Sequence, residues 1–199
     1  MILHFLITGL HCASYFGIDE IVATLTETRG CDIDQGDCMG VTPLMWAAQQ
    51  GNQGVVRLLL ARSDVNIDEP DNFGQTPLWW ASYNGHEGVV RLLPARDDVN
   101  PDKSDSSGRT PLWGASCNGH KGVVNLLLAR DDVNPDKPHS SGQTPLWAAS
   151  FFGHEGVVRL LLARGDVNPD EPERLGQTPL WSASENGHEG VVRLLEGYG

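Results

Sequence analysis

The sequence lacks the motifs that mark several classes of functional site. Its 199 residues include only four cysteines, which form neither a Cys-x-x-Cys pair nor a disulfide framework. No Gly-x-x-x-x-Gly-Lys-Ser/Thr loop, nucleophile elbow or EF-hand calcium loop occurs. We therefore expect no enzyme activity and no cofactor. We also expect no metal site, because no short cysteine pair anchors the one candidate set of ligands: His4, His11, Cys12, Cys31 and Cys38.

Basic residues are scarce. There are 14 Lys and Arg against 26 Asp and Glu, which gives a net charge of −12. The excess acid lies in residues 64–73, 97–107, 131–141 and 166–175. This charge would repel phosphate backbones, so we expect no nucleic-acid partner. Two interpretations of the acid stay open: it keeps the chain soluble, or it attracts a basic partner.

Long hydrophobic runs are also missing. The apolar start, residues 1–8 (MILHFLIT), is far too short to span a bilayer and has neither the basic residues nor the cleavage site of a signal peptide. We interpret it as a segment packed beside the first helix, and we expect no membrane association. Cysteines without a disulfide pattern suit reduced thiols, which favours a cytoplasmic or nuclear location.

A repeat dominates what the sequence does contain. Thr-Pro-Leu recurs every 34 residues, and Thr8-Gly9-Leu10 keeps the same register in a degenerate copy; the five full copies begin at Thr42, Thr76, Thr110, Thr144 and Thr178. A fixed period of this length predicts stacked copies of one small unit. We predict a single domain over residues 1–199, with six copies at approximately 1–39, 40–73, 74–107, 108–141, 142–175 and 176–199.

Residues 76–109 show what one copy predicts. Thr76 is placed to cap a first helix, and Pro77 suits the first helical position. Gly85 ends that helix, and an apolar stripe indicates a second one: Val89, Val90, Leu92 and Leu93. Residues 97–108 contain Asn-Pro and Ser-Gly without an apolar run, which predicts an extended hairpin, here called a finger. The unit is therefore all-α: helix, turn, helix, finger.

These sequence motifs occur in the order of the ankyrin repeat. The chain resembles that repeat from about Thr8 to Leu195, in six copies. The resemblance implies an all-α solenoid of helix-turn-helix units with extended hairpin fingers. The sequence of the repeats is most similar to that of fungal ankyrin arrays, which often lie C-terminal to NACHT-type NTPases or stand alone.

The chain departs from the family pattern after Thr-Pro-Leu. The usual His there ties neighbouring loops by hydrogen bonds, and its replacement puts that network in question; tryptophan takes its place at Trp79, Trp113, Trp147 and Trp181, while Met45 and His11 stand there in the first two copies. We expect Trp79 and Trp147 to be buried between copies. Pro94 replaces the Leu of other copies, which predicts a weaker end of that second helix.

The candidate binding residues are those that vary between copies. Ankyrin resemblance implies that the two positions before each Gly-His face a concave groove and touch partners. We therefore predict partner contacts there and beside the finger glycines, at Gln49, Gln50, Phe73, Tyr83, Asn84, Cys117, Asn118, Phe151, Phe152, Leu175, Glu185 and Asn186. The alternative is that exposed positions simply tolerate change. The recurring histidines indicate a structural role instead: His86, His120, His154 and His188.

The function that these observations favour is non-catalytic protein–protein interaction through the concave surface of helices and fingers. One alternative is the sensor or regulatory portion of a larger fungal NACHT-type NTPase, and another is a structural spacer. We expect a monomer whose partner is a protein with a basic segment that bears one or two aliphatic or aromatic anchors.

Overall fold

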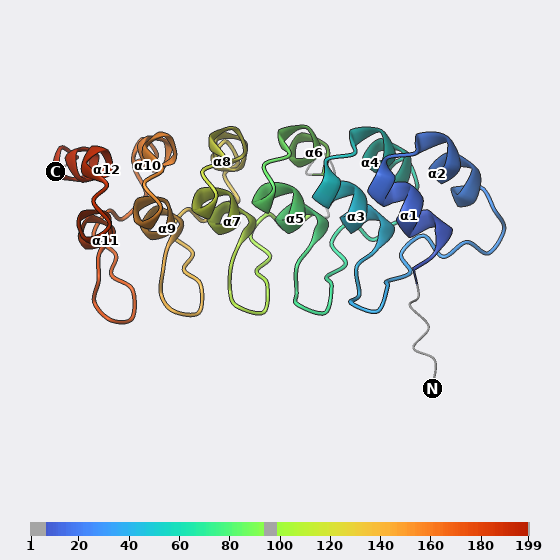
Figure 1. Ribbon diagram of the computed structural model, residues 1–199, viewed down its shortest axis with the longest axis horizontal. Helices are drawn as coiled ribbons and strands as arrows, with labels where there is room; N and C mark the ends of the chain where they lie inside the picture. The colour runs from blue at the N-terminus through green and yellow to red at the C-terminus, as the bar shows by residue number, and fades with distance from the viewer. Residues whose placement is uncertain (1–6, 94–98, 199) are drawn as a thin grey trace. The chain divides into compact units, whose positions relative to one another are not determined.

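The computed structural model describes residues 7–93 and 99–198, and in these residues every regular element is a helix. Figure 1 shows them as helix-turn-helix units joined by fingers. The twelve helices of this part of the chain are α1 (Gly9–Phe16), α2 (Asp19–Thr26), α3 (Pro43–Gln50), α4 (Gln53–Leu60), α5 (Pro77–Tyr83), α6 (Glu87–Leu92), α7 (Pro111–Cys117), α8 (Lys121–Leu128), α9 (Pro145–Phe151), α10 (Glu155–Leu162), α11 (Pro179–Glu185) and α12 (Glu189–Glu196). The predicted all-α architecture of repeated helix-turn-helix units with fingers is confirmed. The expectations for Pro94 and for residues 1–6 lie outside the described residues.

Threonine starts each first helix as predicted. The Thr144 hydroxyl accepts the backbone N–H of Trp147 at 3.1 Å, and Pro145 needs no partner at the first helical position. The same cap forms at Thr42, Thr76, Thr110 and Thr178. In the degenerate first copy, Thr8 and His11 bond each other reciprocally as a capping box, so the missing proline does not remove the helix start.

The chain forms two compact units, and each is built in the same way. In the first unit, residues 1–81 and 86–100, α1 packs on α2 and α3, and α4 packs on α2, α3 and α6. In the second unit, residues 82–85 and 101–199, α9 packs on α7, α10 and α11, while α10 also contacts α8 and α12. Within each unit the first helices form one row, the second helices another, and the fingers extend on the side of the first row (Figure 1). The single domain over 1–199 stays a prediction.

The core of both units is made by residues that recur once per copy. The leucine of Thr-Pro-Leu is at most 1% exposed in four copies: Leu44, Leu78, Leu112 and Leu146. Burying such a side chain stabilises the fold by about 1.5–3 kcal/mol. Trp79 and Trp147 are 3% and 6% exposed, which confirms their predicted burial. Other side chains of the first helices and fingers, such as Phe151 and Leu175, stay exposed.

Candidate protein-binding surface

Histidines tie each copy to the one before it. The Nε2 atom of His86 lies 2.8 Å from the Gln49 carbonyl oxygen in the first unit. Three equivalent bonds of 2.9–3.0 Å occur in the second unit, His120 to Tyr83, His154 to Cys117 and His188 to Phe151. A carbonyl oxygen only accepts, so Nε2 carries the proton. The predicted structural role of these histidines is confirmed. In the first unit Asn52 replaces the histidine and donates to the carbonyls of Ser14 and Tyr15.

The second tie, at the position after Thr-Pro-Leu, forms only in part. His11 Nε2 donates to the Val41 carbonyl at 3.1 Å, and Trp147 Nε1 donates to the Gln177 carbonyl at 3.1 Å, in each case 30 residues along the chain. The indole N–H thus takes the place of the usual imidazole donor. The buried Trp113 Nε1 atom has no hydrogen-bond partner within the described residues. Tryptophan therefore keeps this network at one copy of the second unit and not at another.

The carboxylates of some finger acids form hydrogen bonds within turns and are not simply exposed to solvent. Asp71 is 6% exposed, and its Oδ1 accepts the backbone N–H groups of Phe73 and Gln75 at 2.9 Å. Its Oδ2 accepts the indole N–H of Trp80 at 3.2 Å. Asp37 makes the same three bonds, to Met39, Val41 and Trp46. Neither interpretation made from the sequence anticipated this turn-forming role.

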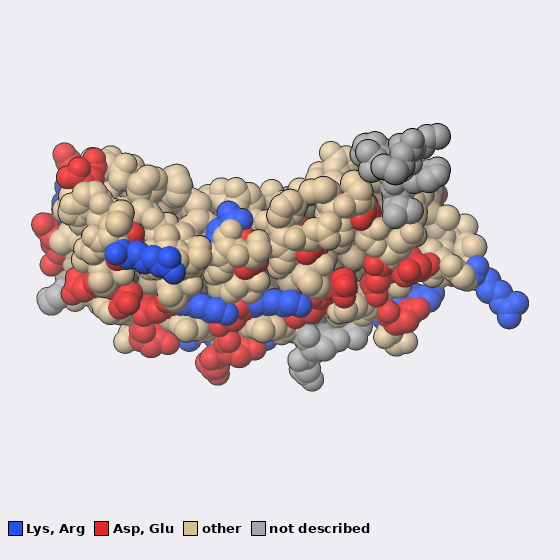
Figure 2. Space-filling view, turned by 90° about the horizontal axis from the view of Figure 1, so that it is seen from below, with Lys and Arg blue, Asp and Glu red and all other residues tan. Residues whose placement is uncertain are grey.

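A second row of aspartates joins successive fingers. The Oδ2 atoms of Asp34, Asp102 and Asp136 accept backbone N–H groups of the next copy at 2.7–2.8 Å; the donors are Asn66, Asn134 and Asn168. Desolvation raises the pKa of each of these three carboxyls above its ordinary value. These aspartates are half-buried, so they contribute to the acidic finger surface (Figure 2) less than their number suggests.

We expect Asp136→Asn to stabilise the protein at neutral pH. Because its folded pKa is raised, the folded state holds the proton more tightly than the unfolded chain, and stability falls as pH rises through that pKa. Asparagine removes the desolvated charge while its amide oxygen still accepts the Asn168 N–H. The gain should not exceed about 1 kcal/mol, because solvent screens a half-exposed charge. Denaturant unfolding at pH 7 and pH 3.5 measures it, and the gain should vanish at the lower pH.

The matched control is Asp170→Asn, since Asp170 is the equivalent residue of the next copy and is exposed. That variant should change stability little at either pH. A loss of stability for Asp136→Asn at pH 7 would show that the bond from Asn168 outweighs the desolvation.

The predicted partner-binding residues are all accessible, but they divide between the two units. The first unit holds Gln49, Gln50 and Phe73, of which Gln49 is half-buried. In the second unit Tyr83 and Cys117 are half-buried, and the exposed members are Asn84, Asn118, Phe151, Phe152, Leu175, Glu185 and Asn186. The side chains of Asn118 and Asn186 donate to carbonyls of their own helices, at Gly114 and Ser182.

Aromatic rings gather on the second unit at α9. Phe151 stacks on Trp147 at 5.2 Å between ring centroids, and the Phe152 ring meets Phe151 edge-on at 4.9 Å. Phe151 and Phe152 remain 36% and 49% exposed. The buried tryptophan therefore supports an accessible pair of phenylalanines.

A larger aromatic cluster lies on the first unit. A groove of about 420 Å³, called the aromatic groove below, is lined by Asp37, Met39, Val41, Trp46, Gln49, Asp71, Phe73, Gln75 and Trp80. Beside it a smaller, apolar pocket of about 190 Å³ shares Trp46 and is also lined by Ile7, His11, Cys12, Tyr15 and Phe16. The Tyr15 ring packs edge-on against both Trp46 and Phe16, at 5.4 and 5.0 Å.

Sequence reasoning placed only Gln49 and Phe73 of this groove. It missed Trp46 and Trp80, although a signal existed: the same position of the later copies holds the small residues Gly114, Ala148 and Ser182. Tyr15 and Phe16 form the equivalent variable pair of the first copy and are not among the predicted contacts. Tyr15, Phe16 and Phe73 are 40%, 71% and 49% exposed, so the cluster is open to a partner.

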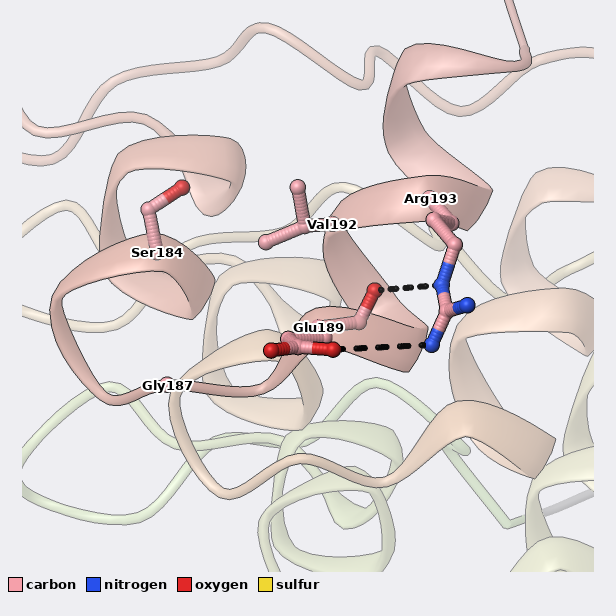
Figure 3. Close-up of a pocket in the computed structure, with 5 residues that line it drawn as sticks. All are labelled: Ser184, Gly187, Glu189, Val192 and Arg193. Atoms are coloured by element: carbon pink, nitrogen blue, oxygen red, sulfur yellow. Dashed lines mark hydrogen bonds and ion pairs between the residues drawn. The ribbon is translucent and has the colours of Figure 1, made fainter.

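A third hollow, of about 400 Å³, lies against α12 and is lined by Ser184, Gly187, Glu189, Val192 and Arg193 (Figure 3). Arg193 points across its own helix: Nε donates to the Glu189 carbonyl at 3.3 Å and NH2 lies 3.8 Å from its carboxylate. Both charged side chains are exposed and pair with each other, so this hollow is a weaker candidate binding site than the aromatic groove.

In the described part of the chain, no group of three or more His, Cys, Asp or Glu side chains is placed to hold a metal ion. None of its helices has the length and apolar character needed to cross a membrane.

Comparison with known proteins gives one consistent family. The family model for ankyrin repeats (3 copies) matches residues 5–71, 63–139 and 131–199. The crystal structure of an ankyrin repeat domain from Acinetobacter baumannii AYE is 26% identical in sequence and similar at a TM-score of 0.83, over 96% of this chain and 97% of that one. No curated protein matches.

Proposed function

Because the chain belongs to the ankyrin repeat family, whose members generally serve as protein-interaction modules, we propose that it binds a partner protein without catalysis. The aromatic groove of the first unit carries this proposal. Its rings and those of the adjoining pocket are exposed in part and lie together, and aromatic side chains dominate the binding energy of protein interfaces.

The backbone around these positions is held for binding. The carbonyls of Tyr15 and Gln49 accept bonds from Asn52 and His86, so the chain that carries the variable side chains is fixed before a partner arrives. Fixing a surface in advance lowers the entropy that association costs. The repeating histidines are occupied in these ties, which favours binding over proton transfer as the role of the array.

We include in the proposal a second contact area around Phe151, Phe152 and Leu175 of the second unit, together with the other predicted partner-binding residues. The partner would be a protein with a basic segment, bound by a monomer in the cytoplasm or nucleus. A place in a larger fungal NACHT-type NTPase is compatible with this role, since the array would then supply the recognition step.

Two double variants test the proposal. A partner captured by the wild-type chain should bind the first-unit variant Phe16→Ala/Phe73→Ala, or the second-unit variant Phe151→Ala/Phe152→Ala, at least about 2 kcal/mol more weakly. The loss should come mainly from faster dissociation, which surface-immobilised chains measure directly. All four side chains are exposed, so folding should be unaffected and unfolding midpoints serve as the check.

The two double variants remove similar apolar area from different units, so the larger loss of affinity identifies the contact area that contributes more to binding. Unchanged affinity in both would contradict the proposal and leave the spacer role as the better explanation.

A further inference from the structure

The aromatic groove contains two negative charges that the described residues do not pair with a cation. Asp37 and Asp71 line it, and each carboxylate accepts three neutral donors: two backbone N–H groups and one indole N–H. Neither carboxylate takes part in any ion pair of residues 7–93 or 99–198. His11, in the adjoining pocket, adds no charge near neutral pH, because desolvation lowers its pKa.

The second unit shows how this turn accommodates a cation. Asp105 stands at the equivalent position, 34 residues after Asp71, and forms the same turn with two backbone N–H groups. There Arg109 donates from Nε to Oδ2 at 2.7 Å, and its NH2 lies 2.6 Å from the same oxygen. The guanidinium carbon lies 6.0 Å from the centre of the Trp113 ring. A guanidinium between carboxylate and indole is thus a stable arrangement at this position.

The sequence of the first unit has no arginine at the two positions equivalent to Arg109. The residues equivalent to Arg109 are Val41 and Gln75, which carry no charge. Trp46 and Trp80 replace it as donors to Oδ2, but an indole N–H leaves the negative charge of the carboxylate in place. A carboxylate offers about four acceptor sites, and three are used here. One site on each of two carboxylates therefore remains for an incoming donor.

We propose that the aromatic groove binds an arginine side chain of the partner, carried on a segment whose neighbouring apolar residue enters the adjoining pocket. This inference rests on the proposed function, and it names the chemistry of that partner. The guanidinium would contact Asp71 or Asp37 and stack on the rings of Trp46, Trp80 or Phe73.

Arginine fits these walls better than lysine does. Its planar guanidinium is weakly hydrated and stacks on aromatic faces, whereas an ammonium is compact and strongly hydrated. The groove and pocket, about 420 and 190 Å³, lie side by side through Trp46 and can take two adjacent side chains of an extended segment. The pocket is lined by Ile7, Tyr15 and Phe16, which suits an aliphatic side chain.

Three synthetic peptides test the inference with the full chain. They are capped octapeptides that contain Leu-Arg, Leu-Lys or Leu-citrulline in the same neutral surroundings, and citrulline has the shape of arginine without its charge. Titration followed by calorimetry should show the arginine peptide binding at least about tenfold more tightly than the citrulline one, and more tightly than the lysine one. This factor is modest because one ion pair and one stacked group differ.

A variant that supplies its own arginine provides the second arm. Gln75→Arg reproduces beside Asp71 the arrangement of Arg109 beside Asp105, so its guanidinium should occupy the groove and weaken binding of the arginine peptide at least about tenfold. Gln143→Arg is the matched control, because it adds the same charge at the equivalent position of the second unit, where His139 replaces the aspartate. It should leave peptide binding unchanged.

Equal affinity for arginine and citrulline, or for arginine and lysine, would overturn the inference. Failure of the arginine peptide to bind at about 1 mM would overturn it as well. In each of these cases, if Phe16→Ala/Phe73→Ala still loses the natural partner, the proposed function stands. Equal affinity for arginine and lysine then means that the groove recognises a cation of either kind, and the other two outcomes mean that it recognises an uncharged segment. If both phenylalanine double variants keep the natural partner and Gln75→Arg keeps the arginine peptide, the inference and the proposed function are both contradicted.

Discussion

Trp147→Ala is expected to lower the free energy of unfolding by about 3–5 kcal/mol, the usual cost of removing a large buried aromatic side chain. Trp147 is 6% exposed, stacks on Phe151, and donates its indole N–H to the Gln177 carbonyl. Alanine would leave a cavity, an unsupported Phe151 ring and a carbonyl without its donor. Denaturant unfolding followed by circular dichroism measures the loss.

The same substitution in the last copy is the control. Trp181 follows the same Thr-Pro-Leu motif but is 44% exposed, so Trp181→Ala should cost much less, about 1 kcal/mol. Trp147→Phe separates the two contributions at the buried site: it keeps most of the apolar area and loses only the donor, which should cost about 1 kcal/mol beyond the change in packing. Equal losses for Trp147→Ala and Trp181→Ala would refute burial as the cause.

Gly153→Ala should be nearly as damaging, at about 2–5 kcal/mol, through two effects that add. The backbone of Gly153 has a φ of 74°, in the left-handed region, where an L side chain costs about 1–2 kcal/mol. An added Cβ would also lie 2.5 Å from the ring of His188, and such overpacking costs about 1–3 kcal/mol. Displacing the ring would break its bond to the Phe151 carbonyl.

Gly187→Ala isolates the backbone effect. Gly187 has nearly the same φ, 72°, but within the described residues no atom beyond its two chain neighbours lies within 4 Å of the position its Cβ would take. This variant should therefore lose only about 1–2 kcal/mol. The difference between the two unfolding free energies measures the cost of disturbing the packing between Gly153 and the His188 ring of the next copy. A difference near zero would rule out this contact as a stabilising interaction.

The local structure could be predicted from the sequence because it depends on short patterns. Thr76 caps its helix, Gly85 has a left-handed φ of 78°, and the leucine of Thr-Pro-Leu is buried, all as the spacing indicates. The fold class follows from those patterns, since a unit with an apolar stripe has to stack on its copies.

The candidate site was harder to predict because it depends on contacts between copies. Trp46 and Trp80 lie in the groove through bonds to Asp37 and Asp71, nine residues earlier in the chain, and no motif encodes such a turn-to-helix contact. Trp147 keeps a bond that the loss of histidine put in question, while Trp113 does not. Periodicity predicts that these positions recur, but the side chain at each one decides what they do.

The bond between histidine and the preceding copy has a consequence for how such an array diversifies. Its acceptor is the main-chain carbonyl of Gln49, Tyr83, Cys117 or Phe151, and every amino acid provides that carbonyl. This hydrogen bond therefore does not depend on which side chain the residue with the accepting carbonyl carries. Copies joined in this way can be exchanged, duplicated or deleted by recombination in blocks of 34 residues while the joint stays intact. The exposed side chains of each block can then be substituted one at a time without loss of this bond.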